Sequence, residues 1–479
     1  MARLTVHELL SVVFAERSEW ELPVSDPAVL AGEAILRGRR VAWVAGDGAH
    51  MGGSIGIAGG EFITEAIERA TAAGLPLVAF PIGGGTRMQE GTPAFLQMVK
   101  ITGAVMAHKA ENLPYLTYLR HPTMGGVFAS WGSLGHVTLA EPGALVGFLG
   151  PRVYEALYGE PFPPGVQLSD NLAELGVIDA VCPPEELAGA LDRLLAVMMA
   201  RRDAGLTSEA HAVAPPVPDA VDLPDVHAWD SVLRTRRDDR PGIRDLLAVA
   251  ARDVTLLNGT GDGESHPGSV LALARFGAAP CVVVGQDRDD QATPLDAAAL
   301  REVRRGIRLA RELRLPLVSV IDTPGAALSK EAEERGLAPE IARTLSDLIT
   351  LPTPTVSLLM GQGTGGIALA LNPADRVLAS QHAWLAPLPP EGASAIMHRT
   401  TERASDMAAA QGVRSADLLA AGIVDRVIPE PEDPAADREA FCAGLGRALS
   451  EELLRVMATE RKERRAARAR RYRSLGVNN

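Results

Sequence analysis

The sequence predicts an α/β protein that contains two similar domains in tandem, and three observations support this prediction. Glycine pairs occur at Gly125-Gly126 and Gly365-Gly366, 240 residues apart, and an apolar run precedes each pair. The segment Leu-Pro-Leu-Val recurs at the same spacing, at residues 75–78 and 315–318. In both halves short apolar runs alternate with segments of helical periodicity, which is the pattern of βαβ units. We interpret this pattern as an internal duplication.

We assign residues 1–204 to the first domain. Its strands are predicted from apolar runs and its helices from apolar residues at helical spacing. For one helix, Thr92 is the predicted N-cap and Pro93 the first helical residue. The predicted elements are, in order, a strand at 41–45, a helix spanning 62–70, a strand at 77–80, a helix at 92–110, a strand at 115–119 and a helix at 185–199.

Residues 205–240 are predicted to form a linker, because four prolines lie there among mixed charges. We assign residues 241–479 to the second domain, in which the order of elements repeats. They are a strand at 281–284, a helix at 300–313, a strand at 317–321, a helix at 339–351 and a strand at 355–360.

The composition excludes several classes of protein. Of the 479 residues 47% are apolar, which is enough for large buried cores, so the chain is not a disordered one. The formal net charge of −13 argues against a nucleic-acid binder, which needs a basic face. The Arg-rich tail at 461–473 is an exception, and we interpret it as a solvated helix end or as a contact to a ligand phosphate or a partner. No apolar run is long enough to span a membrane and no signal peptide is evident, so we expect a cytoplasmic protein.

Cysteine and histidine usage indicates no metal site. Cys182, Cys281 and Cys442 are isolated from one another, so we expect buried thiols rather than a zinc ribbon or a disulfide framework. The ten histidines are scattered, without the spacing of a ligand set. His50 and His121 lie near glycine turns, where we interpret them as solvated or capping residues.

Two glycine motifs have the spacing of other chemistries. Residues 361–366 match the dinucleotide fingerprint G-x-G-x-x-G, but they fall late in their domain and no acidic residue follows between 379 and 390. Residues 52–56 match the nucleophile elbow G-x-S-x-G, but they do not leave a strand directly. We therefore interpret Ser54 as a polar turn residue.

The two glycine pairs themselves predict two oxyanion sites. A glycine pair after a strand lets backbone N–H groups face a substrate, and a helix that starts there aims its positive end at the same point. Fixed donors of this kind stabilise an enolate or ureido oxygen without reorganising during the reaction. The alternative is that each pair only allows a helix and a strand to pack closely.

At these residues the chain resembles the carboxyltransferase of acetyl-CoA and acyl-CoA carboxylases, with the β-type and α-type subunits fused in one polypeptide. In the first half the similar segments are Met-Gly-Gly-Ser-Ile-Gly at 51–56, Gly-Gly-Thr-Arg-Met-Gln-Glu at 84–90, Pro-Thr-Met-Gly-Gly-Val at 122–127 and Gly-Pro-Arg-Val at 150–153. In the second half they are Ile-Asp-Thr-Pro-Gly-Ala at 321–326, Glu-Glu-Arg-Gly at 333–336 and Pro-Glu-Gly at 390–392. The resemblance covers nearly the whole chain.

The resemblance implies a crotonase-like (ClpP/crotonase) ββα-repeat fold in each half, with acyl-CoA held by the first half and carboxybiotin by the second. It also implies an active site between the N-domain of one protomer and the C-domain of another, and hence a homo-oligomer, a dimer or a multiple of dimers. The implied oxyanion donors surround Gly125, Gly126, Gly365, Gly366 and Ile367. The implied cofactor-binding residues are Gly84, Gly85, Thr86 and Arg87 in the first half, and Gly325 and Ala326 in the second. A biotin carboxylase and a biotin carboxyl carrier protein are implied as partners in trans.

Four departures from the family pattern leave alternatives open. The zinc ribbon of the β-type subunit is missing, Ile367 stands in place of glycine, Ala327 in place of an aromatic residue, and Gln362 in place of glutamate. Three of these departures lie in the biotin half, where Ile367 could narrow the pocket. A biotin-independent decarboxylase of a malonyl thioester, on CoA or a carrier protein, and a non-catalytic assembly subunit are therefore the alternative functions.

Overall fold

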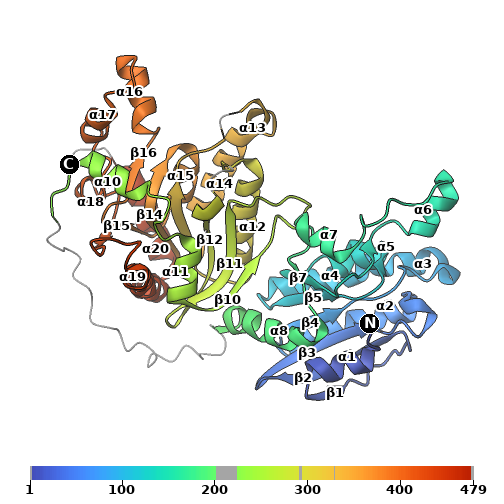
Figure 1. The fold of residues 1–479 in the computed structure, drawn as a ribbon. Coiled ribbons are helices and arrows are strands. Elements are labelled where there is room, and N and C mark those ends of the chain that lie inside the picture. Colours follow the sequence, from blue (N-terminus) through green and yellow to red (C-terminus); the bar gives the residue numbers. More distant parts are fainter. Residues whose placement is uncertain (1–2, 201–223, 291–293, 328, 476–479) are drawn as a thin grey trace. The chain divides into compact units, whose positions relative to one another are not determined.

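The computed structural model describes residues 3–200, 224–290, 294–327 and 329–475, and the chain divides into two compact α/β units (Figure 1). Unit 1 comprises Met1–Asp203 together with Leu257–Glu264, and unit 2 comprises Ala204–Leu256 and Ser265–Asn479. Within the described residues, no helix combines the length and the apolar character needed to cross a bilayer.

The described part of unit 1 contains a seven-stranded sheet and a separate two-stranded one. Strands β1 to β3 pair in antiparallel fashion, whereas every later pairing is parallel. Across the larger sheet the order is β1 (Glu16–Glu19), β2 (Val29–Leu36), β3 (Arg39–Gly46), β4 (Leu77–Phe80), β5 (Tyr115–Leu119), β7 (Val137–Ala140) and β9 (Ala180–Val181). The small sheet pairs β6 (Thr123–Met124) with β8 (Val146–Gly147).

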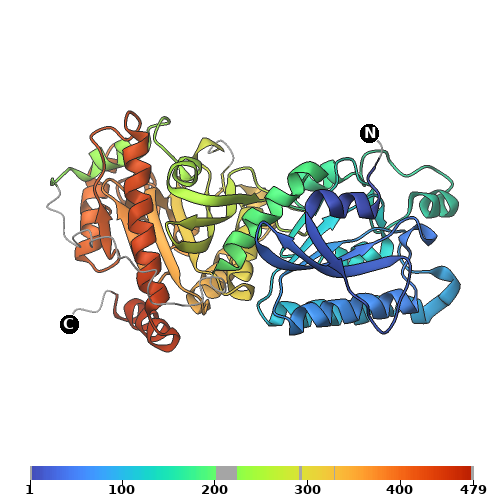
Figure 2. The same cartoon turned by 90° about the horizontal axis from the view of Figure 1, so that it is seen from below.

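Helices of unit 1 cover its sheet, and α2 and α4 pack side by side (Figure 2). The helices are α1 (Val6–Val13), α2 (Ile57–Ala72), α3 (Gly91–Phe95), α4 (Gln97–Ala110), α5 (Gly125–Val127), α6 (Pro151–Tyr158), α7 (Ser169–Glu174) and α8 (Pro184–Met198), with short turns η1 (Met51–Gly53), η2 (Met88–Glu90) and η3 (Phe128–Gly132). Apolar residues of α2 and α4 form one core with β3 and β4, because their spacing places them on one face of each helix.

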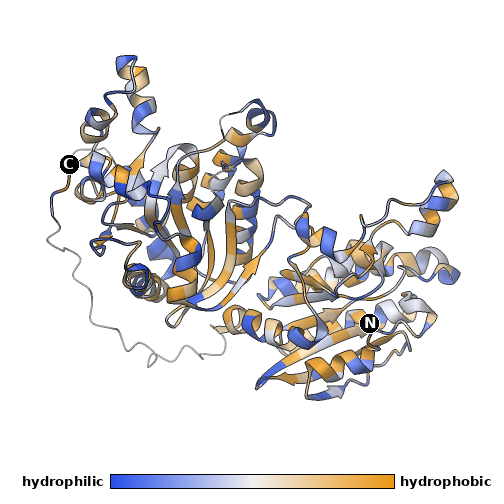
Figure 3. Ribbon diagram, in the orientation of Figure 1, coloured by the Kyte–Doolittle hydropathy of each residue, from blue (hydrophilic) through white to orange (hydrophobic). Residues whose placement is uncertain are grey.

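The described part of unit 2 contains an eight-stranded sheet. Its path is β10 (Ala251–Leu257), β11 (Ser269–Phe276), β12 (Ala279–Gln286), β13 (Leu317–Thr323), β14 (Thr355–Thr364), β15 (Arg376–Ser380) and β17 (Arg426–Ile428), with β16 (Trp384–Ala386) paired to β14. The pairing of β11 with β12 is antiparallel and the pairings from β12 to β17 are parallel. Hydropathy follows this layering, since the buried strands are the most hydrophobic segments (Figure 3).

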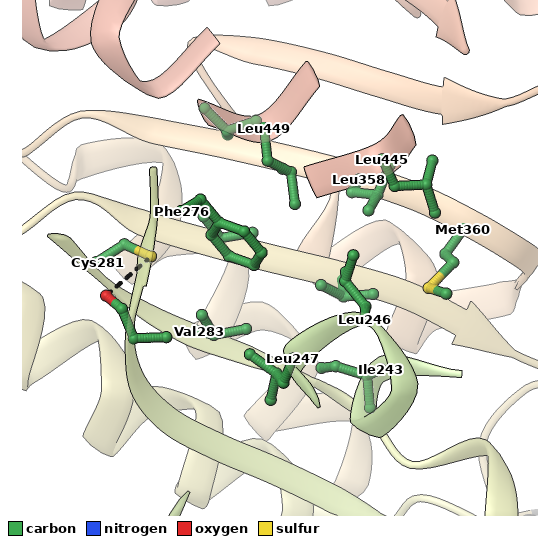
Figure 4. Close-up of a cluster of buried hydrophobic side chains, with 14 of the residues drawn as sticks. Ile243, Leu246, Leu247, Phe276, Cys281, Val283, Leu358, Met360, Leu445 and Leu449 are labelled. Atoms are coloured by element: carbon green, nitrogen blue, oxygen red, sulfur yellow. Dashed lines mark hydrogen bonds between the residues drawn. The ribbon is translucent and has the colours of Figure 1, made fainter. Parts of the chain in front are cut away.

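Helices α11 and α19 bury their apolar faces against the unit 2 sheet. The helices of this unit are α10 (Ala228–Thr235), α11 (Ile243–Ala250), α12 (Ala297–Glu312), α13 (Lys330–Glu334), α14 (Leu337–Thr350), α15 (Gly365–Leu371), α16 (Pro390–His398), α17 (Ala404–Ala410), α18 (Ser415–Ala420), α19 (Arg438–Ala458) and α20 (Arg461–Ser474), with the turn η5 (Arg288–Asp290). Ile243 and Leu246 of α11 meet Leu445 and Leu449 of α19 around Phe276 (Figure 4).

Cys182, Cys281 and Cys442 are buried free thiols, which confirms the prediction made for them.

The predicted duplication is confirmed by the element boundaries. Both ends of β2, β3 and α2 recur 240 residues later as the ends of β11, β12 and α12. The strands that precede the two glycine pairs, β5 and β14, also begin 240 residues apart. The two units are therefore built on the same frame.

The helix predicted at 92–110 is two helices, α3 and α4, which are separated at Leu96. The predicted N-cap at Thr92 is wrong, because Thr92 lies inside the first turn of α3 and the cap position is Glu90. The turn η2 ends directly at Gly91, whose φ of +62° lets the chain change direction there, so α3 begins at once and leaves no separate cap at Thr92.

Part of the segment predicted to be a linker is folded. Residues 201–223, which contain three of its prolines, lie outside the described residues. Helix α10 follows and buries Ala228, Ser231, Val232 and Thr235. This face packs against Trp384 and Val413 in an apolar cluster of unit 2. Its mixed charges lie on the other face, so a composition typical of a linker concealed an amphipathic helix.

Two arginines of the tail are structural rather than solvated. Arg468 is 2% exposed and Arg464 6% exposed on α20. The Arg468 guanidinium donates to both Asp375 oxygens, at 2.8 and 2.7 Å, and to the carbonyls of Leu348 and Leu351 at 3.1 and 2.9 Å. The tail thus satisfies the C-terminal carbonyls of α14 and the residues that follow.

Unit 1 is completed by a segment from much later in the sequence, Leu257–Glu264. The amides of Asn258 and Thr138 donate to the two carboxylate oxygens of Asp179, at 3.2 and 2.9 Å. Gly261 N donates to Gly176 O at 3.0 Å. This segment is called the closing segment below.

Candidate functional site

In unit 1 the structure brings the two predicted glycine segments into main-chain contact. Gly83 N donates to Pro122 O at 2.7 Å, and Met124 N donates to Gly83 O at 2.9 Å. A Cβ built on Gly85 would lie 3.4 Å from Gly126 N, and one built on Gly125 would lie 3.4 Å from Gly84 O. The main chains at Gly84, Gly85, Gly125 and Gly126 thus lie side by side, and these four glycines form one cradle of backbone.

The unit 1 cradle presents backbone donors. Within the described residues, the amides of Gly85 and Gly126 donate to no acceptor. Gly126 lies in the first turn of α5, where amides have no partner inside the helix. Gly85 and Gly125 have φ of +110° and +56°, a conformation that favours glycine. Two neighbouring free donors, of which Gly126 N lies at a helix start, are suited to an oxyanion.

Thr86 and Arg87, predicted to bind cofactor, fasten the cradle. Thr86 forms a bridge with Ile55, and Arg87 N donates to Ile55 O at 2.8 Å. The Arg87 guanidinium lies 3.0 Å from Asp26 and 3.1 Å from Glu90 and also donates to Ser54 O at 3.1 Å. The Asp26 carboxylate raises the Arg87 pKa. Arg87 therefore ties the loop to the segment that precedes β2.

Unit 2 repeats the cradle 240 residues later. Ala326 forms a bridge with Leu295, as Thr86 does with Ile55, and Ala327 N donates to Leu295 O at 2.9 Å. Gly325 and Gly365 have φ of +131° and +70°, close to the values at Gly85 and Gly125. The start of α15 at Gly365 corresponds to the start of α5.

The unit 2 cradle differs at one donor. Gly325 N, which corresponds to Gly85 N, donates to Thr323 Oγ1 at 3.1 Å. Gly83 occupies the equivalent position in unit 1 and has no hydroxyl that could accept from the Gly85 amide. An oxyanion at this amide would share it with the Thr323 hydroxyl. Thr323 was not among the predicted site residues, although Thr two residues before Gly is a signal for this turn.

Ile367 lies in the protein interior. Its side chain is fully buried in α15, as is that of Val127, its counterpart in unit 1. Gly366 is only partly buried, and a Cβ built on it would lie 2.7 Å from Ile341 Cδ1. A side chain introduced at position 366 would therefore change the space at the cradle, whereas the Ile367 side chain does not reach it.

Ser54 and His50 make only local contacts in the segment before α2. The Ser54 hydroxyl donates to Met51 O at 2.9 Å, which confirms a turn residue. His50 Nδ1 lies 3.0 Å from Asp47. Among the described residues, no group of three His, Cys, Asp or Glu side chains could hold a metal ion.

His121 precedes the unit 1 cradle and accepts a hydrogen bond at Nδ1 from Leu145 N, at 3.0 Å. The ring must be neutral at Nδ1 to accept. Burial, together with the nearby Arg3 charge, lowers the His121 pKa below its ordinary value of 6.5. Folding thus favours the neutral ring.

Because the folded pKa is the lower one, the contribution of His121 to stability is present above about pH 6.5 and is lost as the pH falls through the folded pKa. We expect the melting temperature to fall between pH 7.5 and 5.5, and to fall less in His121→Asn, whose Oδ1 still accepts from Leu145. Burial also lowers the pKa of His382, so some dependence of the melting temperature on pH should remain in the variant. Equal slopes by calorimetry for both proteins would contradict this assignment.

The chain matches a known family along most of its length. Residues 7–465 match the family described as carboxyl transferase domain. The chain belongs to this family. The carboxyl transferase chain is 56% identical over 455 residues to the probable biotin-dependent acyl-coenzyme A carboxylase beta3 subunit of Mycobacterium tuberculosis (strain ATCC 25618 / H37Rv), covering 95% of this chain and 90% of that protein.

More distant relatives cover a similar extent. The acetyl-coenzyme A carboxylase carboxyl transferase subunits beta/alpha of Salinispora arenicola (strain CNS-205) are 37% identical over 464 residues, which is 94% of this chain and 82% of that protein. The structure of transcarboxylase 12S, a hexamer described with methylmalonyl-coenzyme A and methylmalonic acid bound, matches with a TM-score of 0.75 at 21% identity. That match covers 95% of this chain and 90% of that one and identifies the carboxyl transferase chain as sharing its fold.

Proposed function

We propose that this chain is the carboxyltransferase component of a biotin-dependent acyl-CoA carboxylase. It would transfer a carboxyl group from carboxybiotin to the α-carbon of an acyl-CoA. The observation that carries this proposal is the pair of matching backbone cradles in a chain that belongs to the carboxyl transferase family along 7–465. The relatives named above are an acyl-CoA carboxylase subunit and an acetyl-CoA carboxylase transferase, which supports the substrate class.

The chain contributes fixed donors rather than an acid or a base. The amides of Gly85 and Gly126 would stabilise the enolate oxygen of the thioester, since they are preformed and unpaired. The amides around Gly365, Gly366 and Ile367 would stabilise a ureido oxygen in the same way. When bound, carboxybiotin supplies the CO2 and then the base for the α-proton. A site of uncharged backbone donors fits this chemistry, because both oxygens carry negative charge only during the reaction.

We further propose that each unit has the crotonase-like fold, that unit 1 is β-type and unit 2 α-type, and that the fused chain has no zinc ribbon. Gly84, Thr86 and Arg87 would belong to the acyl-CoA side, and Gly325 and Ala326 to the biotin side. The partners would be a biotin carboxylase and a biotin carboxyl carrier protein in trans, and the chain would form a homo-oligomer. The hexamer described for transcarboxylase 12S supports the last point.

A matrix of thioesters against biotin tests the function. We expect purified protein given malonyl-CoA and free biotin to form acetyl-CoA and carboxybiotin, the reverse of the carboxylation. Acetyl-CoA and propionyl-CoA with carboxybiotin test the forward direction and the acyl preference. Loss of CO2 from malonyl-CoA without biotin would instead identify a decarboxylase. If no thioester reacts and pathway activity survives Gly126→Val and Gly366→Val, the chain is an assembly subunit.

A further inference from the structure

A buried ion pair lies beneath the glycine strand of unit 2. Arg288 Nη1 donates to Asp322 Oδ2 at 2.7 Å, and the two side chains are 3% and 1% exposed. The other carboxylate oxygen, Asp322 Oδ1, accepts from Gln362 N at 2.9 Å. A Cβ on Gly361 would overlap the same carboxylate. Asp322 therefore fixes the main chain immediately before Gly365-Gly366.

The other end of Arg288 holds the end of helix α10. Its Nη2 donates to the carbonyls of Thr235 and Arg237, at 2.6 and 2.7 Å. Between these residues Arg236 makes a bidentate ion pair with Glu391, at 2.5 and 3.0 Å. Glu391 lies in the first turn of α16. A continuous set of charged contacts thus joins the glycine strand to α10 and α16.

Unit 1 provides an internal comparison. In the 240-residue register the counterparts of Arg288 and Asp322 are Gly48 and Ile82. Ile82 makes an apolar contact there, since a Cβ built on Gly48 would lie 3.0 Å from Ile82 Cδ1. The cradle of unit 1 nonetheless has the same bridges and glycine conformations as that of unit 2. The frame can therefore form without an ion pair at this place.

Removing two charges from water is costly, and apolar replacements of buried pairs are often neutral or stabilising. Stability of the frame alone does not explain why unit 2 has the pair. Unlike the contact between Ile82 and Gly48, the ion pair connects the glycine strand to α10. Through Arg236 and Glu391 it also connects the strand to α16.

We propose that Arg288 and Asp322 are positioning residues. They fix the Gly365-Gly366 cradle relative to helices α10 and α16, and the binding and reaction of biotin in unit 2 depend on this position. This proposal rests on the proposed function. The pair acts through the main chain at Gln362 and through Arg236, and it is not itself catalytic. Glu391 belongs to the same set and sets the position of α16.

The double variant Arg288→Met/Asp322→Leu tests the proposal, since it copies the apolar solution of unit 1. We expect it to melt within a few degrees of the unmodified chain. In transfer from malonyl-CoA to free biotin, we expect the KM for biotin to rise about 10-fold and kcat to fall at least 10-fold, with the KM for malonyl-CoA unchanged. The control Arg426→Met/Glu451→Leu removes another ion pair, 2.8 Å long, between β17 and α19, whose side chains are 3% and 16% exposed. It should leave both KM values unchanged.

Wild-type kinetics in the folded Arg288→Met/Asp322→Leu variant would overturn the proposal, because the pair would then only assist folding. An equal rise in both KM values would overturn it as well. If the double variant does not fold, Glu391→Gln at the partly exposed end should raise the KM for biotin about 2–5-fold, and an unchanged KM would overturn it. Failure of the unmodified chain to transfer any carboxyl group would instead refute the proposed function.

Discussion

Replacing Gly126 with valine is expected to lower the rate of carboxyl transfer by about 10²–10³-fold, which is the usual cost of losing one oxyanion donor. A Cβ at this position would lie 3.2 Å from Met98 Cγ and 3.4 Å from Thr86 Oγ1. A branched side chain there would press on the Met98 and Thr86 side chains and occupy the space in front of the Gly126 amide. The rate of acetyl-CoA formation from malonyl-CoA and biotin measures the effect.

Gly103→Val is the matched control, because Gly103 lies in α4 with no atom within 4 Å of a built Cβ. We expect it to leave the rate unchanged. Gly366→Val, whose Cβ would lie 2.7 Å from Ile341 Cδ1, should cause a comparable loss in the biotin half. If Gly126→Val has an unchanged melting temperature and an unchanged rate, the unit 1 cradle is not an oxyanion site.

Replacing Arg468 with methionine is expected to destabilise unit 2 by about 3–5 kcal/mol, which is typical of breaking a buried ion pair from one side. The change leaves Asp375, whose side chain is 4% exposed, without its strongest partner. It also removes the arginine donor from the carbonyls of Leu348 and Leu351, of which Leu348 O keeps the Leu351 amide at 3.2 Å. Urea unfolding followed by circular dichroism measures the loss.

Arg470→Met is the control, because Arg470 lies two residues after Arg468 on the same helix and is exposed. We expect it to change the unfolding free energy by less than about 0.5 kcal/mol. A similar midpoint for Arg468→Met and Arg470→Met would show that the tail does not stabilise unit 2.

The strands and the duplication could be predicted because buried parallel strands are continuous apolar runs, and the repeat preserves their spacing. Ser54 was assigned correctly because its motif does not follow a strand. Helix α10 could not be recognised, since charges and nearby prolines conceal the apolar face formed by Ala228 and Val232. The buried arginines of the tail resemble exposed ones until their acceptors at Asp375 and Leu351 are known.

The candidate site was predictable in part. The glycines at 84–85, 125–126, 325 and 365–366 have a local signature, and the structure brings each set together. The supporting contacts do not have one, because Asp26 and Arg87, or Arg288 and Asp322, are far apart in the sequence and meet only after folding. Comparison of the halves in the 240-residue register would have shown the change from Gly48 and Ile82 to a charged pair.

The closing segment affects how the gene can be divided. A break within 201–223 would separate the two halves where composition suggests a linker, yet Leu257–Glu264 would then be encoded with the second half. The first fragment would carry Asp179, whereas Asn258, whose amide donates to Asp179, would lie on the other polypeptide. Viable two-gene versions of this chain would therefore depend on fragment complementation, with an eight-residue peptide of one product completing the fold of the other.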